Sequence, residues 1–249
     1  MPTPRPYALT IAGFDPSAGA GVLADVKAME ANGVYGLAAC TALTAQNDVA
    51  FERVSWVPLA DMQAQIRLLA DRFTIGFVKI GLIESLPLLL KLISWLKALN
   101  PPVSIVWDPV LKATAGYEFH ARPAITLLQS ICCELALITP NRPEALRLVS
   151  ATSAEAAAET LATWCPVLLK GGHDTAALAT DLLLVGGARH EFSAPRLPHG
   201  EKHGSGCVLS AAVLARQALG DDLGAACQAG KAYTAAFLGS NDTLLGYHY

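Results

Sequence analysis

Short apolar runs alternate with helical patterns along most of the chain, and this alternation constrains the fold more than any other feature. Most of the runs lack polar alternation, which is expected for strands covered on both faces of a sheet. Strands are predicted at residues 7–12, 37–44, 77–80, 104–107, 135–138 and 167–169. Helices are predicted between them at 22–31, 59–72, 85–99, 122–132, 142–149 and 153–164. This order predicts an α/β fold with a mainly parallel central sheet and helices on both faces.

The remainder of the chain extends the same pattern. Residues 181–185 and 190–194 are predicted as late strands that could form an antiparallel edge, and Ala-rich helices follow at 205–219 and 223–238. Two patterns typical of capping boxes, Asn141 with Glu144 and Thr152 with Glu155, mark helix starts. Because 249 residues fit one large α/β domain and no linker interrupts them, we expect a single domain over residues 1–249, with residues 1–6 flexible.

Charge and cysteine usage exclude several classes of function. The net charge of -3 and the pI near 6.1 provide no basic field that would attract nucleic acid or an anionic membrane. The longest apolar stretch, residues 86–99, contains Lys91 and Lys97 and is too short to span a bilayer. The six cysteines show no metal-ligand spacing, and the first residues contain no apolar signal core. We therefore expect reduced thiols and a cytoplasmic protein.

Polar side chains follow the predicted strands at the points where the strands end. In an open parallel sheet the carboxyl ends of the strands form the ligand crevice. Such a residue can simply begin a loop, but a set on one rim favours a site. The set comprises Asp15, Gln46, Asp108, Asn141, Glu144 and Lys170.

The strongest local signal is His203-Gly204-Ser205-Gly206-Cys207, which precedes an apolar helical run. Glycines before a helix allow a ligand close to the backbone, and the free N–H groups of the first turn favour an anion. A transferring phosphoryl group would fit there. Cys207 would lie in that first turn, where the pKa of a thiol tends to fall. The alternative is a turn capped by Ser205, with Cys207 as a small core residue.

A second glycine-rich segment, residues 13–21, lies between a predicted strand and a helix. Gly19, Gly21 and Ala24 match a dinucleotide fingerprint only weakly, because the next strand ends at Gln46 rather than at an acid. The chain contains no Gly-x-x-x-x-Gly-Lys-Ser/Thr sequence, which excludes an ordinary P-loop.

These segments also carry a family resemblance. Residues 9–25 resemble the opening signature of the hydroxymethylpyrimidine kinases, and further matches follow in order over roughly residues 8–235. The further matches are Thr41–Asn47, Lys79–Leu82, Asp108–Val110, Thr139–Ala145, Lys170–His173 and His203–Ala212. Each motif alone is modestly specific, but the ordered set is highly specific.

The resemblance implies a ribokinase-like fold and a dimer. It also implies that Mg-ATP phosphorylates 4-amino-5-hydroxymethyl-2-methylpyrimidine (HMP) and its monophosphate in thiamine biosynthesis. In this comparison Gln46 matches the amide that grips the aminopyrimidine edge, and Asp25 and Gly13 match residues lining that pocket. An amide offers a donor and an acceptor side by side, as that edge requires.

The resemblance also implies the parts that transfer the phosphoryl group. Cys207 matches the residue beside the acceptor hydroxymethyl, where it would accept the proton as thiolate or through water, and the backbone of residues 204–207 matches the anion hole. Lys170 matches a lysine near the nucleotide phosphates. Asp108 and Glu144 match acids near the metal.

Each assignment has a structural alternative. Glu144 could act only in the capping box, Asp108 could form a turn before Pro109, and Asp25 could be a solvated helix charge. Lys170 could have a purely structural role. His173 and His203 are left out of the catalytic set.

Several positions depart from the family pattern. Phe14 replaces Ser or Thr, Ala18 replaces Gly, and Leu82 replaces the usual Met of the pocket wall. Residues 112–116 match the usual loop only loosely, and residues 244–249 replace a Gly/Pro/His-rich closing segment. The alternatives are therefore a pyridoxal kinase of the same fold, a non-catalytic pyrimidine-binding protein and, more distantly, a dinucleotide-binding oxidoreductase.

Overall fold

A computed structural model describes residues 4–99, 103–111, 122–172, 178–197 and 201–249. Within these residues the strands join one nine-stranded sheet of order β3-β2-β1-β4-β5-β6-β7-β8-β9. The strands are β1 (Tyr7–Phe14), β2 (Tyr35–Gln46), β3 (Phe51–Trp56), β4 (Phe77–Ile80), β5 (Ser104–Trp107), β6 (Leu137–Ile138), β7 (Val167–Leu169), β8 (Leu178–Val185) and β9 (Ala188–Pro195). Residues 112–116 and His173 lie outside the described part.

The centre of the sheet is parallel from β2 to β7, as predicted, and both edges are antiparallel. On one edge β8 pairs with β7 and β9 in antiparallel register, which confirms the late edge strands. On the other edge β3 pairs with β2, from Ala42 opposite Trp56 to Gln46 opposite Phe51. The sequence analysis missed β3, because its burial alternates only weakly and it carries Glu52 and Arg53 on an exposed edge.

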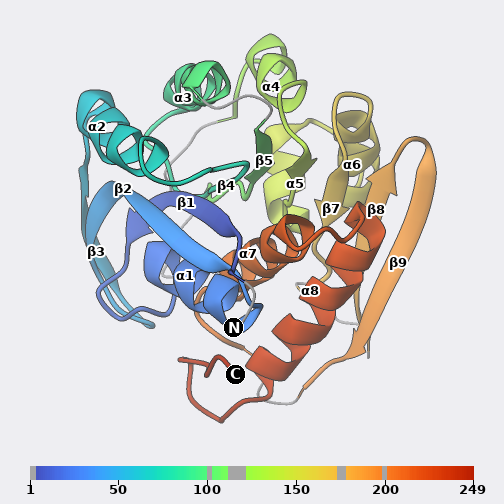
Figure 1. Cartoon of the computed structure of the whole chain (residues 1–249). Helices are drawn as coiled ribbons and strands as arrows, with labels where there is room; N and C mark the ends of the chain where they lie inside the picture. Colours follow the sequence, from blue (N-terminus) through green and yellow to red (C-terminus); the bar gives the residue numbers. More distant parts are fainter. Residues whose placement is uncertain (1–3, 100–102, 112–121, 173–177, 198–200) are drawn as a thin grey trace.

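Helices cover both faces of the sheet (Figure 1). One layer contains α2 (Leu59–Ala70), α3 (Leu86–Leu99), α4 (Ile125–Cys132), α5 (Arg142–Leu148) and α6 (Ala154–Ala162), and the other contains α1 (Gly21–Ala31), α7 (Ser205–Ala218) and α8 (Leu223–Leu238). Apolar side chains form a separate buried cluster on each face, with Ile66 and Leu92 in one and Val213 and Phe237 in the other. These two clusters explain why the central strands are apolar on both faces.

One predicted helix cap is confirmed and one is wrong. The Asn141 side chain accepts a hydrogen bond from Glu144 N (2.8 Å), and the Glu144 carboxylate accepts one from Asn141 N (2.7 Å). At α6, however, Ser153 rather than Thr152 caps the helix, since Ser153 Oγ accepts from Ala156 N (3.1 Å). The two hydroxyl residues are adjacent, and the pattern alone could not choose between them.

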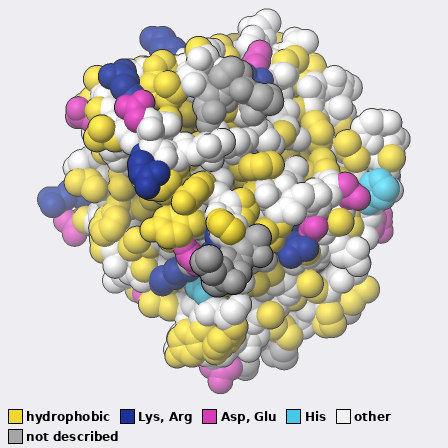
Figure 2. All heavy atoms as spheres, viewed as in Figure 1, with side chains coloured by type: hydrophobic (Ala, Val, Ile, Leu, Met, Phe, Trp, Pro, Cys, Tyr) yellow, Lys and Arg dark blue, Asp and Glu magenta, His cyan; other side chains and the backbone are white. Residues whose placement is uncertain are grey.

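Two further observations concern the surface and the first residues. On the face drawn in Figure 2, Lys and Arg side chains are interspersed with Asp and Glu and form no single basic patch. None of the helices that the structure describes combines the length and the apolar character needed to span a bilayer.

The first described residues are bonded to the rest of the fold. Pro6 O accepts a hydrogen bond from Tyr35 N (2.9 Å), and Arg5 forms an ion pair with Glu30 (2.5 Å).

Candidate active site

Three of the predicted residues meet at the carboxyl ends of the parallel strands, where two carboxylates lie around the ammonium group of Lys170. Lys170 directly follows β7, and its Nζ lies 2.7 Å from Asp108 Oδ1 and 3.7 Å from Glu144 Oε2. Lys170 is only 8% exposed. Burial opposes its charge, but the carboxylates of Asp108 and Glu144 outweigh this effect and raise the pKa of Lys170. Lys170 is therefore a fixed positive charge at the rim of the sheet.

Asp108 follows β5, and its carboxylate accepts hydrogen bonds from residues of several elements. It accepts hydrogen bonds from Lys170 Nζ (2.7 Å), Thr139 Oγ1 (3.1 Å) and Ser210 Oγ (3.2 Å). Lys79 Nζ also lies 4.0 Å from Asp108 Oδ2. Burial alone would raise the pKa of Asp108, but Lys170 and Lys79 lower it below its usual range. Asp108 is thus an ionised group within a network and more than a turn former.

Glu144 combines the two roles that the sequence left open. Its carboxylate closes the capping box at the start of α5 and also faces Lys170. Burial raises the pKa of Glu144 to about 7, with the Lys170 charge opposing the rise and the Asp108 charge adding to it. The capping role therefore does not exclude a role at the site.

The first turn of α7 lies beside the Lys170 ammonium. A Cβ atom built on Gly206 would lie 3.1 Å from Lys170 Nζ, so a side chain there would push the ammonium away. No side chain caps the helix, whose N-cap is Gly204 and not Ser205. Ser205 N donates to Lys202 O (3.4 Å), and the N–H groups that follow in the first turn remain available to an anion. The turn and Lys170 together form a cradle of positive potential.

Gly204 allows two loops of the site to approach each other. It has φ 71° and ψ 14°, and a Cβ at this position would lie 2.1 Å from the carbonyl oxygen of Gly19. A glycine is required both by the left-handed conformation and by this close approach. The segment before α7 is therefore packed directly on the residue 13–21 loop.

A buried acid and a histidine also join these loops. Asp15 accepts hydrogen bonds from Ser17 N (2.9 Å) and Ala20 N (2.9 Å) within its own loop. It also accepts one from His203 Nε2 (2.8 Å), in the segment that precedes α7. Burial acts to raise the pKa of Asp15, but the hydrogen bonds from His203 and Ser17 lower it. Asp15 therefore organises the loop.

Within the same loop, Ala18 has φ 56°. The left-handed conformation costs a non-glycine residue about 1 kcal/mol, which explains why the family pattern has Gly at this position.

Cys207 lies in the first turn of α7, as predicted, but its electrostatics differ from the prediction. Burial raises the pKa of Cys207 to about 12, and the nearby charges of Asp108 and Asp25 add to the effect. The opposing influences, the Lys79 ammonium and a hydrogen bond with the Gly21 backbone, are weaker. The expected fall of the thiol pKa at a helix start is therefore wrong, because the thiol is buried and two buried carboxylates act on it.

The residues predicted for the acceptor pocket lie on β1, β2 and α1. Gln46 ends β2 and is half-buried, and its side chain forms no hydrogen bond within the described residues. Gly13 lies against Leu82, since a Cβ on Gly13 would lie 3.0 Å from Leu82 Cδ2. The small residue at 13 therefore leaves room for the Leu82 side chain.

Asp25 is not a solvated helix charge. It lies on α1, is fully buried, and accepts hydrogen bonds from Lys79 Nζ (2.7 Å to each oxygen) and from Thr10 Oγ1 (2.5 Å). Its interactions join β1, β4 and α1, and its charge acts on the Cys207 thiol, so its side chain supports the site.

Lys79 is the site residue that the sequence analysis quoted in a motif but assigned no role. It lies in the apolar strand β4 and is 0% exposed. A lysine in such a strand needs a buried carboxylate partner, and Asp25 among the apolar residues of α1 is the matching signal. Thr139 and Ser210, which donate to Asp108, also lie within matched segments, and they received no role because single hydroxyl residues carry no spacing signal.

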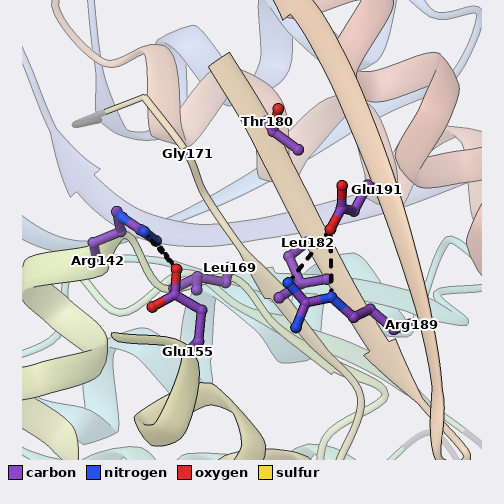
Figure 3. A pocket seen from close by; sticks show the side chains of 8 residues that line it. All are labelled: Arg142, Glu155, Leu169, Gly171, Thr180, Leu182, Arg189 and Glu191. Carbon is purple, nitrogen blue, oxygen red and sulfur yellow. Dashed lines mark hydrogen bonds and ion pairs between the residues drawn. The ribbon is translucent and has the colours of Figure 1, made fainter. Parts of the chain in front are cut away.

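A cavity of about 220 Å³ lies elsewhere among the described residues, and charged side chains line it (Figure 3). Arg142 is paired with Glu155, and Arg189 lies 3.3 Å from Glu191. Lys170 does not line this cavity, whose charged groups are bonded to one another, and we assign it no part in the chemistry.

Comparisons with known proteins identify the family of this chain. The family model described as phosphomethylpyrimidine kinase matches residues 15–248. The hydroxymethylpyrimidine/phosphomethylpyrimidine kinase of Salmonella typhimurium is 36% identical, with 96% of this chain and 93% of that protein covered. The enzyme of the same name from Haemophilus influenzae is 35% identical, with 92% and 89% covered. A thiamine biosynthesis bifunctional protein of Geobacter sulfurreducens is 36% identical, and the match covers 94% of this chain but 49% of that protein.

Solved structures show the same fold. Phosphomethylpyrimidine kinase of Clostridium difficile superposes with a TM-score of 0.76 at 30% identity, covering 92% of this chain and 98% of that one. Pyridoxal kinase of Bacillus subtilis in an ADP complex superposes with a TM-score of 0.80 at 26% identity, covering 94% and 92%. These matches confirm the ribokinase-like fold and remove the oxidoreductase alternative. With a charged cradle at the sheet rim and a family match over nearly its whole length, the chain belongs to the phosphomethylpyrimidine kinase family.

Proposed function

We propose that the protein transfers the γ-phosphoryl group of ATP to the hydroxymethyl group of HMP, and then to the phosphate of its monophosphate, in thiamine biosynthesis. The observation that supports this most is the Lys170 ammonium, which lies between two carboxylates and the uncapped first turn of α7. Phosphoryl transfer depends mainly on positioning and charge stabilisation, and this arrangement supplies both.

In this proposal ATP lies along the rim with its phosphates near Lys170 and the backbone N–H groups of residues 204–207. Asp108 and Glu144 would hold Mg²⁺, partly through water. Their oxygens suit Mg²⁺, which commonly binds one or two carboxylates together with water and phosphate oxygens. Water and the substrate phosphates would supply the remaining ligands. Bound Mg²⁺ would neutralise phosphate charge.

The acceptor would lie between Gln46 and Cys207. The unpaired amide of Gln46 is free to pair with the aminopyrimidine edge, and Gly13 with Leu82 would form one wall. Cys207 would adjoin the hydroxymethyl and, as thiolate or through water, accept its proton. Because burial raises the pKa of Cys207 to about 12, little thiolate exists at neutral pH, and the anion cradle would contribute most of the rate.

Pyridoxal kinase is the second candidate, because the Bacillus subtilis enzyme shares the fold at a TM-score of 0.80. Pyridoxal also carries a hydroxymethyl group on a six-membered aromatic ring. Its edge has a phenolic oxygen where HMP has an amino group, so Gln46 favours the pyrimidine. We further propose a cytoplasmic homodimer, for which the elution volume on size exclusion is the direct test.

A coupled ADP-release assay tests the proposed function. The arms are HMP, its monophosphate, pyridoxal and no acceptor, each with wild-type protein and with Lys170→Met. We expect acceptor-dependent ADP release with both pyrimidines and a large loss in Lys170→Met. ADP release that is independent of any acceptor, or absent with all of them, would contradict the proposal.

A further inference from the structure

The segment that follows α8, residues 240–245 and here named the strap, lies against the residues that precede α7. Lys202 is 6% exposed, and its Nζ donates to the carbonyl oxygens of Asn241 and Thr243 and to Asn241 Oδ1 (3.3 Å). No carboxylate pairs with this ammonium among the described residues. A buried charge must be hydrogen-bonded, so these neutral oxygens fix the position of Lys202 relative to the strap.

The strap has its own internal order. Asn241 Oδ1 accepts a hydrogen bond from Thr243 N (2.8 Å), and Asn241 Nδ2 donates to Leu245 O (2.9 Å). A short polar side chain that bonds to backbone two and four residues later fixes a turn. Asn241 therefore gives the strap the shape that presents its carbonyl oxygens to Lys202.

The strap also contacts both loops of the site. His203 N donates a hydrogen bond to Leu244 O (2.9 Å). A Cβ built on Gly19 would lie 2.7 Å from Leu245 Cδ2 and 2.6 Å from His203 Cδ2. The strap is thus packed at the junction where the residue 13–21 loop meets the start of α7, and no element of the proposed chemistry requires it.

We infer that Lys202 is a positioning residue for phosphoryl transfer, which acts by holding the strap against His203 and Gly19 and so fixing the first turn of α7. The inference rests on the proposed function for its kinetic consequence, but its structural consequence can be measured separately. If the ammonium is lost, the strap carbonyls lose their donor and the start of α7 gains mobility. Substrate contacts themselves are unchanged, so turnover should suffer more than acceptor affinity.

A double-mutant cycle tests this inference in the full chain. Lys202→Met keeps the length of the side chain but removes the ammonium, and Asn241→Ala removes the turn of the strap. We expect about a tenfold lower kcat in each variant, with acceptor KM changed less than threefold. Because both residues act through the strap, the double variant should be no slower than the worse single variant. Lys91→Met, at an exposed position of α3, is the matched control and should match wild type.

Hydrogen exchange measured by mass spectrometry gives a readout that does not depend on activity. Peptides that cover residues 13–21 and 203–209 should exchange faster in Lys202→Met and Asn241→Ala than in wild type and Lys91→Met. Unchanged exchange in these peptides, or losses of kcat that multiply in the double variant, would overturn the inference. If wild type phosphorylates none of the acceptors, the proposed function fails, while the exchange comparison still decides the role of Lys202. If Lys202→Met does not fold, Asn241→Ala carries the exchange comparison alone.

Discussion

Lys79 and Asp25 form an ion pair inside the fold, with Lys79 Nζ 2.7 Å from each carboxylate oxygen and neither side chain exposed. The pair joins β4 to α1, and both of its charges influence the pKa of Cys207. A buried pair of this kind is not strong evidence for stability, but the loss of one partner leaves an uncompensated charge in the core.

Asp25→Asn should therefore destabilise the protein by about 3–5 kcal/mol, because Lys79 loses its counter-charge. The double variant Asp25→Leu with Lys79→Met should recover most of this loss, since it leaves no unpaired charge. Urea unfolding measures both free energies of unfolding. A double variant as unstable as Asp25→Asn would show that the pair contributes through packing and not through charge compensation.

Gln46→Leu should raise the KM for HMP about ten- to a hundredfold and leave the KM for ATP nearly unchanged. The substitution keeps approximate volume but leaves the aminopyrimidine edge unpaired, which costs about 1–3 kcal/mol. Steady-state kinetics with each substrate varied in turn measures both constants. Gln129→Leu, at an exposed position of α4, serves as the control. Little change in either KM would mean that Gln46 only ends β2.

The pH dependence of turnover tests Cys207. If the thiolate accepts the acceptor proton, the active form is the deprotonated one, and a pKa near 12 lies above the working range. Glu144, with a pKa of about 7, titrates below pH 8, so the informative range lies above it. We then expect kcat to keep rising from pH 8 to about 9.5 without a plateau, and we expect this rise to disappear in Cys207→Ser together with part of the turnover. A flat profile, or near-normal turnover in Cys207→Ser, would assign the rate to the anion cradle alone.

His248 should make stability depend on pH. Its ring lies 4.8 Å from that of Phe237, and Nδ1 lies 2.7 Å from the Tyr233 hydroxyl. Burial, with a smaller effect of Lys27, lowers the pKa of His248 to about 4. The unfolded chain then binds more protons between pH 6.5 and 4, so this contribution to stability is complete above pH 6.5 and is lost as the pH falls towards 4.

After allowance for solvent screening, we expect the effect of His248 to be about 1 kcal/mol, or a few degrees in the thermal midpoint. His248→Gln keeps a polar group near Tyr233 but cannot gain this charge. The difference in thermal midpoint between wild type and His248→Gln should therefore shrink between pH 7.5 and 5. A constant difference over that range would exclude a titrating His248.

The fold was largely predictable because the apolar sequences of its central strands indicate that both faces are buried. The run in β1 is almost wholly apolar on both faces, and helices such as α2 and α3 bury an apolar face. The exposed strand β3 escaped prediction because an edge strand needs few apolar residues. The choice between Thr152 and Ser153 depended on backbone geometry that no local pattern records.

The candidate site was predictable where its residues end strands or open helices, as Asp108, Lys170 and Gly206 do. What the sequence could not supply was the distance between charges that are far apart in the chain. The high pKa of Cys207 arises mainly from burial of the thiol, with the charges of Asp108 and Asp25 adding to it, and the role of Lys79 arises from its contact with Asp25. The contact of Lys202 with Asn241 and Thr243 likewise exists only in the folded chain.

The identity of the acceptor is the central claim, and one competition reaction tests it most directly. Wild-type protein is given equal concentrations of HMP and pyridoxal with limiting ATP, and mass spectrometry measures the ratio of the two phosphorylated products, which equals the ratio of kcat/KM values. We predict that the phosphorylated pyrimidine exceeds pyridoxal phosphate by at least about tenfold, the factor expected from about 1.4 kcal/mol of additional pairing at Gln46. A product mixture in which pyridoxal phosphate predominates would contradict the account and establish the pyridoxal kinase alternative.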